Sequence, residues 1–232
     1  NNACSGYDGG KMNQDPILGP VGCYCCDYGD GGSDQCQDAP SGAQECTGMG
    51  SLNAEVIAEI STVDYVWDET NTKEDFIASG NYIPENNAVT GIKVDEKGAI
   101  YIAIPRWRPG VPSTLNKLVH DESHGFIMEP WPSWDFNTKT LHYCQSMAIT
   151  SDNNMWILET GRENFLGTDP SAIINRPAGF YIINIASKLV QNQYLFPESV
   201  VPSDNSFLND IAIDESRGYA YFTSTWGNGL LI

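Results

Sequence analysis

One hairpin pattern recurs along the chain and limits its possible folds more than any other feature. Each copy has a hydrophobic strand, a polar turn around Asp, Asn or Gly, and a second strand rich in aromatic residues. The clear copies span 91–104, 146–159 and 210–224, and a looser copy spans 179–191. The starts of the three clear copies lie about 55 to 65 residues apart, a spacing typical of one propeller blade plus a long loop. Since a lone hairpin cannot bury its apolar face, the copies must stack, and the pattern predicts an all-β fold, a β-propeller.

The number of repeats is small for a closed ring. The chain of 232 residues holds about three blades, whereas a closed propeller needs at least four. An apolar strand close to Ile232 also needs a partner for its backbone groups and side chains. We therefore expect the polypeptide to continue past Ile232. The alternative is that another chain completes the sheet.

Between the repeats, composition and prolines predict the connecting elements. We expect a short helix over 54–60, a strand over 61–67, and low helix content elsewhere. Three prolines within 105–112 stop both helix and central strand, which predicts an ordered loop. A further strand is expected to end near 136, and a long loop to cover 160–176.

The cysteines divide the chain into two predicted domains, 1–50 and 51–232. Six of the seven cysteines lie in the first domain, among many glycines and few aliphatic residues. Such a segment cannot form a hydrophobic core, so it is predicted to be a disulfide-stapled module from an oxidising compartment. The disulfide candidates are Cys4, Cys23, Cys25, Cys26, Cys36 and Cys46, in pairings that the sequence leaves open.

Two alternatives concern individual cysteines. A zinc site at Cys23, Cys25, Cys26 and Cys36 is disfavoured, because the spacing is poor for a structural site and no histidine lies nearby. Cys144 stands alone at the start of a predicted strand. It is either a buried free thiol or the partner of a cysteine in the first domain.

Charge and hydropathy exclude two classes of partner. The formal net charge of −18 would repel a phosphate backbone, so nucleic-acid binding is not expected. No run of apolar residues is long enough to span a membrane. An acidic surface of this kind favours solubility and attracts small cations.

Five motifs occur in an order that resembles the yellow/major royal jelly protein family. They cover roughly residues 55–232 and leave the first 50 residues unmatched. They are PRWRPGVPSTLN at 105–116, MWILETG at 155–161, RPAGFYI at 176–182, FLNDIAID at 207–214, and AYFTS with the following Gly-rich segment from 220 onward. MWILETG departs from the family pattern by having Glu159 in place of Asp.

The resemblance implies a secreted six-bladed propeller, but it does not fix one function. Members of the family include insect proteins linked to dopachrome conversion in melanin formation, salivary binders of biogenic amines, and oligomeric jelly proteins. Binding of a small cationic or aromatic ligand, such as a catechol- or indole-amine, is the favoured function. A dopachrome tautomerase-like isomerase is one alternative. A structural subunit of an extracellular matrix, assembling as a homo-oligomer or filament, is the other.

Four residues are predicted to lie near a mouth of the central channel. Glu159, Asn209 and Asp210 carry oxygen atoms that could contact an amine or hold Ca²⁺, although a structural role in capping backbone N–H groups between blades is the simpler interpretation of the carboxylates. Arg106 is expected to pair with Glu159 or Asp210, or to orient an anionic ligand. No nucleophile motif, phosphate loop or dinucleotide fingerprint is present, so an enzymatic role has little support.

Histidines offer a weak alternative. His120 and His124 have a spacing that would suit a metal if the segment were helical, but its polar, Gly-ended sequence argues against a helix. We therefore predict no metal site there, and no cofactor other than the Ca²⁺ considered above.

Overall fold

The computed structural model describes residues 56–226 and 229–231, together with four two-residue strands nearer the N-terminus. The chain divides into two units, Asn1–Ile57 and Ala58–Ile232. In the first unit, β1 (Tyr7–Asp8) pairs with β2 (Lys11–Met12) in antiparallel fashion, and β3 (Cys23–Tyr24) pairs with β4 (Gln44–Glu45) in parallel. The predicted disulfides of this unit lie outside the described residues.

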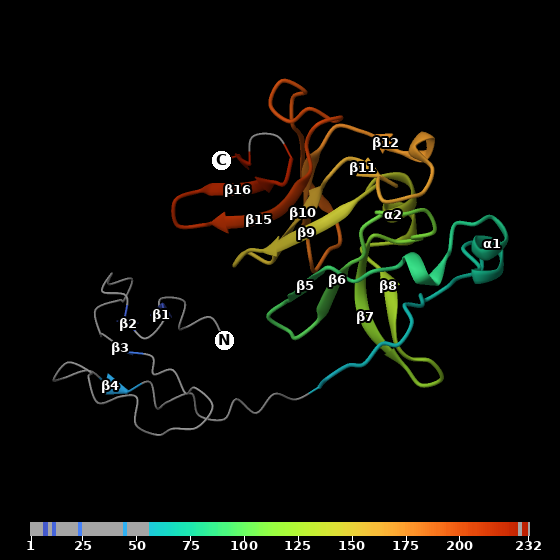
Figure 1. The fold of residues 1–232 in the computed structure, drawn as a ribbon. Coiled ribbons are helices and arrows are strands. Elements are labelled where there is room, and N and C mark those ends of the chain that lie inside the picture. The colour runs from blue at the N-terminus through green and yellow to red at the C-terminus, as the bar shows by residue number, and fades with distance from the viewer. Residues whose placement is uncertain are drawn as a thin grey trace. The chain divides into compact units, whose positions relative to one another are not determined.

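The second unit consists mainly of three antiparallel sheets in sequence order (Figure 1). The first sheet has the order β5-β6-β7-β8, each strand pairing with the next along the chain. Its strands are β5 (Gly91–Val94), β6 (Ile100–Ala103), β7 (Leu115–Asp121) and β8 (Gly125–Pro130). The predicted hairpin at 91–104 is therefore confirmed.

The second sheet repeats this four-stranded meander, with an additional hairpin in one connection. Its strands are β9 (Cys144–Ile149), β10 (Asn154–Glu159), β13 (Gly179–Asn184) and β14 (Val190–Leu195). Between β10 and β13, the segment predicted as a plain loop contains the short pair β11 (Arg162–Glu163) and β12 (Ile174–Asn175) and a 3-10 turn, Pro170–Ala172.

The third sheet contains β15 (Leu208–Asp214), β16 (Tyr219–Ser224) and β17 (Leu230–Leu231). The hairpins predicted at 146–159, 179–191 and 210–224 all form. The described residues are thus mostly β-structure, as predicted, but their sheets do not close into a ring.

The hairpin turns share one side-chain device. Near the end of the first strand, an Asp or Asn oxygen accepts a hydrogen bond from a backbone N–H two or three residues later. Asp95 accepts from Lys97 N at 2.9 Å, and Asp214 accepts from Arg217 N at 3.1 Å. A residue with positive φ then completes each of these turns, Gly98 and Gly218 respectively. The repeated Asp and Gly in the sequence therefore fix the turns locally.

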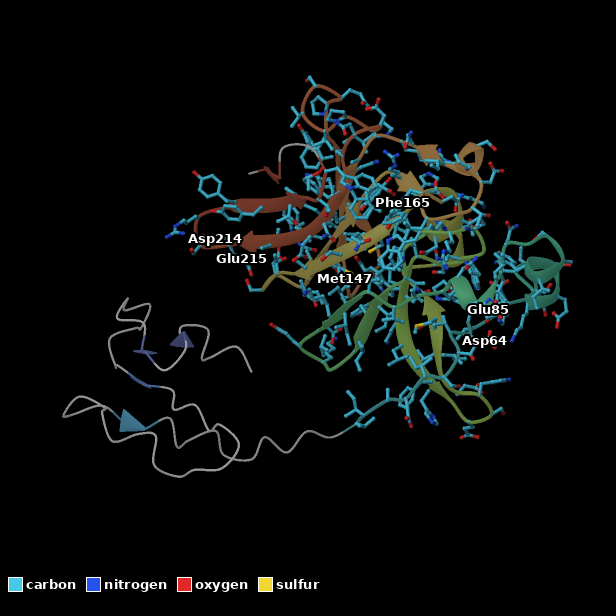
Figure 2. The ribbon with its side chains drawn as sticks, viewed as in Figure 1. Asp64, Glu85, Met147, Phe165, Asp214 and Glu215 are labelled. Carbon is cyan, nitrogen blue, oxygen red and sulfur yellow. The ribbon has the colours of Figure 1, made fainter. Side chains whose placement is uncertain are left out.

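Apolar side chains fill the spaces between successive sheets. One core cluster joins the first two sheets and includes Tyr101, Leu115, Met147 and Ile157 (Met147 is labelled in Figure 2). Another joins the second and third sheets and includes Leu158, Leu208 and Phe222. The first strands pack in a row, because β9 contacts both β5 and β15. This packing brings the starts of β9 and β15 together, where Asn209 and Asp210 lie.

The segment before the first sheet differs from its prediction. Residues 56–60 are not helical, and within 61–67 only Tyr65 makes a β-bridge, to Met128. A short helix instead follows, α1 (Lys73–Ala78), because Thr72 caps it by accepting a hydrogen bond from Asp75 N. Tyr65 and Tyr82 cover the other face of the first sheet.

A second helix replaces a predicted strand. α2 (Trp134–Lys139) begins where Ser133 Oγ accepts a hydrogen bond from Phe136 N. The predicted strand to 136 is therefore wrong, because the Ser133 cap ends the extended segment and starts a helix. Both helices have six residues, so the expectation of low helix content holds for the described part of the chain. No helix there is long and apolar enough to cross a membrane.

Candidate functional site

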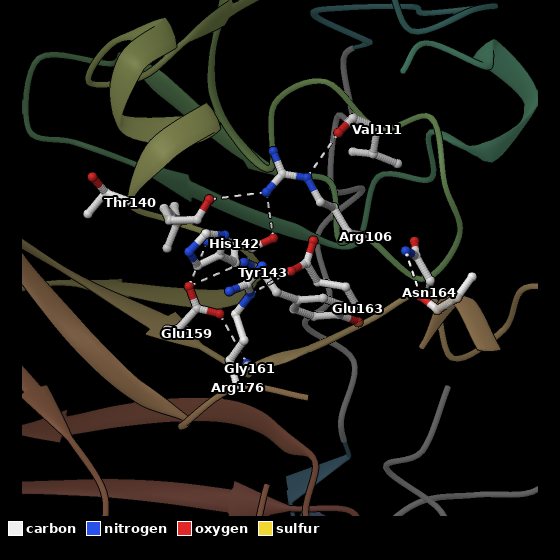
Figure 3. Close-up of polar contacts among 12 residues, drawn as sticks. Arg106, Val111, Thr140, His142, Tyr143, Glu159, Gly161, Glu163, Asn164 and Arg176 are labelled. Atoms are coloured by element: carbon white, nitrogen blue, oxygen red, sulfur yellow. Dashed lines mark hydrogen bonds and ion pairs between the residues drawn. The ribbon is translucent and has the colours of Figure 1, made fainter. Parts of the chain in front are cut away.

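The four predicted site residues fall into two groups. Arg106 and Glu159 lie inward, where the loop after β6 meets the end of β10 (Figure 3). Asn209 and Asp210 lie on β15 and are exposed to solvent. No hydrogen bond or ion pair joins the two groups among the described residues.

Arg106 holds three segments of the backbone together. Its guanidinium donates five hydrogen bonds of 2.6 to 3.1 Å, all to backbone carbonyls. The accepting residues are Val111, Pro112, Asn137, Leu141 and His142. A guanidinium has five N–H groups, so all of its donors are used within the protein.

This arrangement corrects the predicted partner of Arg106. Neither Glu159 nor Asp210 forms a hydrogen bond to it; carbonyl oxygens take that place because the loop 106–112 folds back over the guanidinium. The carboxylates of Glu163 and Glu159 affect Arg106 only through their charge, while burial lowers the pKa of the guanidinium.

Glu159 caps backbone N–H groups at the start of β9. Its Oε2 accepts from His142 N at 2.7 Å and Tyr143 N at 3.3 Å, and its Oε1 accepts from Gly161 N at 3.0 Å. The side chain is buried, and loss of solvation raises its pKa to about 7 despite the three donors. The contacts of Glu159 are therefore those of the alternative considered from the sequence, in which the carboxylate caps backbone N–H groups.

An ion pair and a histidine complete this inner group. Arg176 Nε lies 3.0 Å from Glu163 Oε1, and Arg176 N donates to Gly161 O. Burial, followed by the charge of Arg176, lowers the pKa of His142. No local pattern indicates Glu163 or Arg176 as a pair, because they meet only through the β11–β12 pairing.

Asn209 and Asp210 face the start of β9 instead of the inner group. Gln145 Nε2 donates to Asn209 Oδ1 at 3.2 Å, and Ser146 Oγ donates to Asp210 Oδ1 at 2.6 Å. Ile211 N also donates to Asp210 Oδ1. Among the described residues no donor reaches Asp210 Oδ2, so this carboxylate retains an acceptor toward solvent.

An aromatic group is linked to this exposed group through Thr225. Asn209 Nδ2 donates to Thr225 Oγ1 at 3.0 Å, next to Trp226. Trp226 packs against Phe165 and Phe207 with ring centroids 5.5 and 5.2 Å away. The guanidinium of Arg162 already lies over the Trp226 ring, 5.0 Å from its centroid. We call Gln145, Ser146, Asn209 and Asp210, with this aromatic group, the strand-start site.

Sequence reasoning missed Gln145 and Ser146, although a signal was present. They precede Asn209 and Asp210 by 64 residues each, so they occupy the same positions in the preceding repeat. Aligning the repeats would have placed these residues side by side, since the first strands of neighbouring sheets pack together.

The remaining metal and cysteine predictions have plain outcomes. His120 lies on β7 and His124 in the turn after it, where its Nδ1 is 2.7 Å from Asp121 Oδ1. The segment is a hairpin and not a helix, as predicted. Among residues 56–226, no three His, Cys, Asp or Glu side chains are grouped to hold a metal ion. Cys144 is a buried thiol that forms no disulfide with any described residue.

Comparison with known proteins supports the resemblance seen in the motifs. Residues 144–232, which begin with β9, match the family described as Major royal jelly protein. "Protein yellow" of Drosophila melanogaster is 27% identical over 182 residues, which are 74% of this chain and 33% of that protein. "Protein yellow" of Drosophila erecta is 27% identical over 180 residues, 73% of this chain and 32% of that protein. "Protein yellow" of Drosophila pseudoobscura pseudoobscura is 26% identical over 180 residues, which are 73% of this chain and 31% of that protein.

The predicted resemblance to the yellow/major royal jelly protein family is therefore confirmed, by the family match over residues 144–232 and by relatives that align with about 73% of the chain. The chain spans about a third of the length of the curated relatives that it matches.

Proposed function

We propose that this relative of the yellow and major royal jelly proteins is a secreted protein that binds small aromatic amines through a β-propeller. The strand-start site is the proposed contact surface. The blades would be the three sheets, and the innermost strands would be β5, β9 and β15. Two complete four-stranded meanders with neighbouring first strands support this propeller arrangement.

One observation carries the ligand class: Asp210 is an exposed carboxylate with an unused oxygen, next to the amide of Asn209. A carboxylate beside an amide oxygen suits an ammonium group, which is drawn in by the net charge of −18. Of the aromatic group, only Trp226 is exposed, and it is the surface proposed for a catechol or indole ring beside Arg162. Arg106 and Glu159 then position the loops and need not contact the ligand.

Dopamine is a suitable probe for calorimetric titration of the full chain. We expect it to bind, and 4-methylcatechol, which lacks the amine, to bind at least tenfold more weakly. Asp210→Asn is expected to weaken dopamine binding at least tenfold, since a charge-assisted hydrogen bond contributes about 1.5 to 3 kcal/mol. Asp214→Asn, on the far end of the same strand, is the matched control and should leave binding unchanged.

No dopamine binding, or equal binding by wild type and Asp210→Asn, would overturn the proposal. Two measurements address the alternatives that the sequence left open. Loss of dopachrome absorbance above the buffer rate would support the isomerase. Concentration-dependent polymers in sedimentation, unaffected by dopamine, would support the structural subunit.

A further inference from the structure

A cavity of about 330 Å³ lies apart from the strand-start site. It opens between the loop after β6, the loop after β10, and the ends of α1 and α2. Its polar lining includes Arg106, Arg108, Thr138, Glu163, Asn81 and Asn164. None of the residues in the strand-start site lines it.

Backbone hydrogen bonds hold the two loops of this cavity in register. Asn164 N donates to Arg106 O at 2.8 Å, and Leu166 N donates to Trp107 O at 2.9 Å. Arg108 Nε donates to Leu166 O at 3.3 Å. The wall is therefore fixed before a ligand arrives, which lowers the entropic cost of binding.

Positive charge dominates this cavity although the chain as a whole is acidic. Arg106 and Arg108 both line it, whereas the one lining carboxylate, Glu163, is already paired with Arg176. Two of the five arginines of the chain thus line the cavity, and a third, Arg176, pairs with its one carboxylate. The excess of positive charge favours an anionic ligand.

Arg108 is the arginine that can bind such a ligand. All five donors of Arg106 are used internally, so it contributes charge alone. In Arg108, by contrast, only Nε has a partner, and no acceptor among the described residues reaches its two terminal nitrogens. A guanidinium fork of this kind suits the two oxygens of a carboxylate.

The apolar part of the lining indicates which kind of group the ligand carries besides its charge. Phe76, Pro109, Val111 and Pro112 supply apolar walls, and Asn81 and Thr138 lie among them. The volume is within the usual range of small-molecule pockets, roughly 300 to 1,000 Å³. We propose that this cavity is a binding site for a small carboxylate with an aromatic body, held by Arg108 and separate from the amine site.

Benzoate tests the charge requirement by calorimetric titration of the full chain. We expect benzoate to bind, benzamide, its neutral analogue, to bind at least tenfold more weakly, and added salt to weaken benzoate binding. Absence of benzoate binding, or equal affinities for benzoate and benzamide, would overturn the proposal.

Two variants locate the site. Arg108→Gln is expected to weaken benzoate binding at least tenfold, whereas Arg217→Gln, an exposed arginine on the β15–β16 turn, should leave it unchanged. Asn81→Asp, which adds a negative charge to the lining, provides a second test if Arg108→Gln does not fold. Unchanged benzoate affinity in a folded Arg108→Gln or Asn81→Asp protein would show that the cavity is not the site.

The amine proposal and the carboxylate proposal can fail independently. Asp210→Asn is expected to leave benzoate binding intact, and Arg108→Gln to leave dopamine binding intact. A joint loss of both ligands in either variant would contradict the assignment of two separate sites.

Discussion

Arg106 and Glu159 are buried charged residues whose partners are backbone groups. Arg106 donates to five carbonyls, and Glu159 accepts from three N–H groups. Irregular loops cannot satisfy their backbone polar groups by regular pairing, so side chains must do so where water is excluded. This need for hydrogen-bond partners explains Arg106 of the PRW motif and Glu159 of MWILETG without reference to a ligand.

The raised pKa of Glu159 predicts how stability depends on pH. In the unfolded chain its pKa is near 4.5, and in the fold it is about 7, so between these values the folded state binds the extra proton. The contribution to stability is full below about pH 4.5 and is lost as the pH rises through 7. Glu159→Gln removes this titration.

Urea unfolding of wild type and Glu159→Gln at pH 5 and pH 8 measures the effect. The free energy of unfolding of wild type, relative to the variant, should fall by about 2 kcal/mol between the two pH values. Taking the difference between the proteins cancels the titration of the other acidic residues. A difference that stays constant from pH 5 to pH 8 would contradict the assignment.

At the scale of elements, the hairpins are governed by their turns and the longer connections by close backbone approach. Gly98 and Gly161 both have positive φ, but they differ in surroundings. A Cβ at Gly98 would meet nothing within 4 Å, whereas one at Gly161 would lie 2.4 Å from Arg176 O. The first glycine serves local conformation, and the second also permits two segments to touch.

Replacing each glycine by alanine separates the two effects. Gly98→Ala should cost about 1 kcal/mol, the usual penalty of a left-handed backbone for a residue with a side chain. Gly161→Ala should cost roughly 3 kcal/mol or more, because the backbone of Arg176 must also move. Thermal or urea unfolding of the two variants measures both costs, and equal losses would mean that the close contact at Gly161 is unimportant.

At the scale of the whole second unit, neighbouring sheets contact through equivalent positions of the repeat. Besides the two pairs at the strand-start site, Ser151 and Glu215 also lie 64 residues apart and form hydrogen bonds, at 3.0 Å from Ser151 N (Glu215 is labelled in Figure 2). Polar contacts therefore fix the lateral register of the second and third sheets, while the apolar cluster between them supplies most of the burial.

A double-mutant cycle tests this register contact. Ser151 Oγ also donates to Glu215 Oε2, and Ser151→Ala removes this bond while keeping those from Ser151 N. Ser151→Ala and Glu215→Ala together should therefore destabilise the protein less than the sum of the single changes, by roughly 0.5 to 1 kcal/mol. Glu96 occupies the equivalent turn of the first sheet and makes no hydrogen bond to Ser151, so Ser151→Ala with Glu96→Ala is the matched control. Additive effects in the Ser151 and Glu215 pair would show that the contact does not couple the two sheets.

The sequence by itself determined the hairpins and the resemblance to the yellow/major royal jelly protein family. Alternating apolar residues with Asp, Asn and Gly at the turns specify each hairpin through contacts within a few residues, and such contacts can be read along the chain. Local signals of the same kind specify α1 and α2, through the caps at Thr72 and Ser133. The predicted propeller closure, disulfides and extracellular location remain predictions.

Only the tertiary structure decided which side chains meet. Arg106 was predicted to pair with a carboxylate, yet it binds carbonyls contributed by residues as far away as His142, and Asn209 and Asp210 contact the preceding repeat instead of Glu159. Charge and residue type indicate that a buried arginine needs acceptors, but many oxygens meet that need equally well. The choice among them depends on how the loops between sheets fold against one another, which no local pattern specifies.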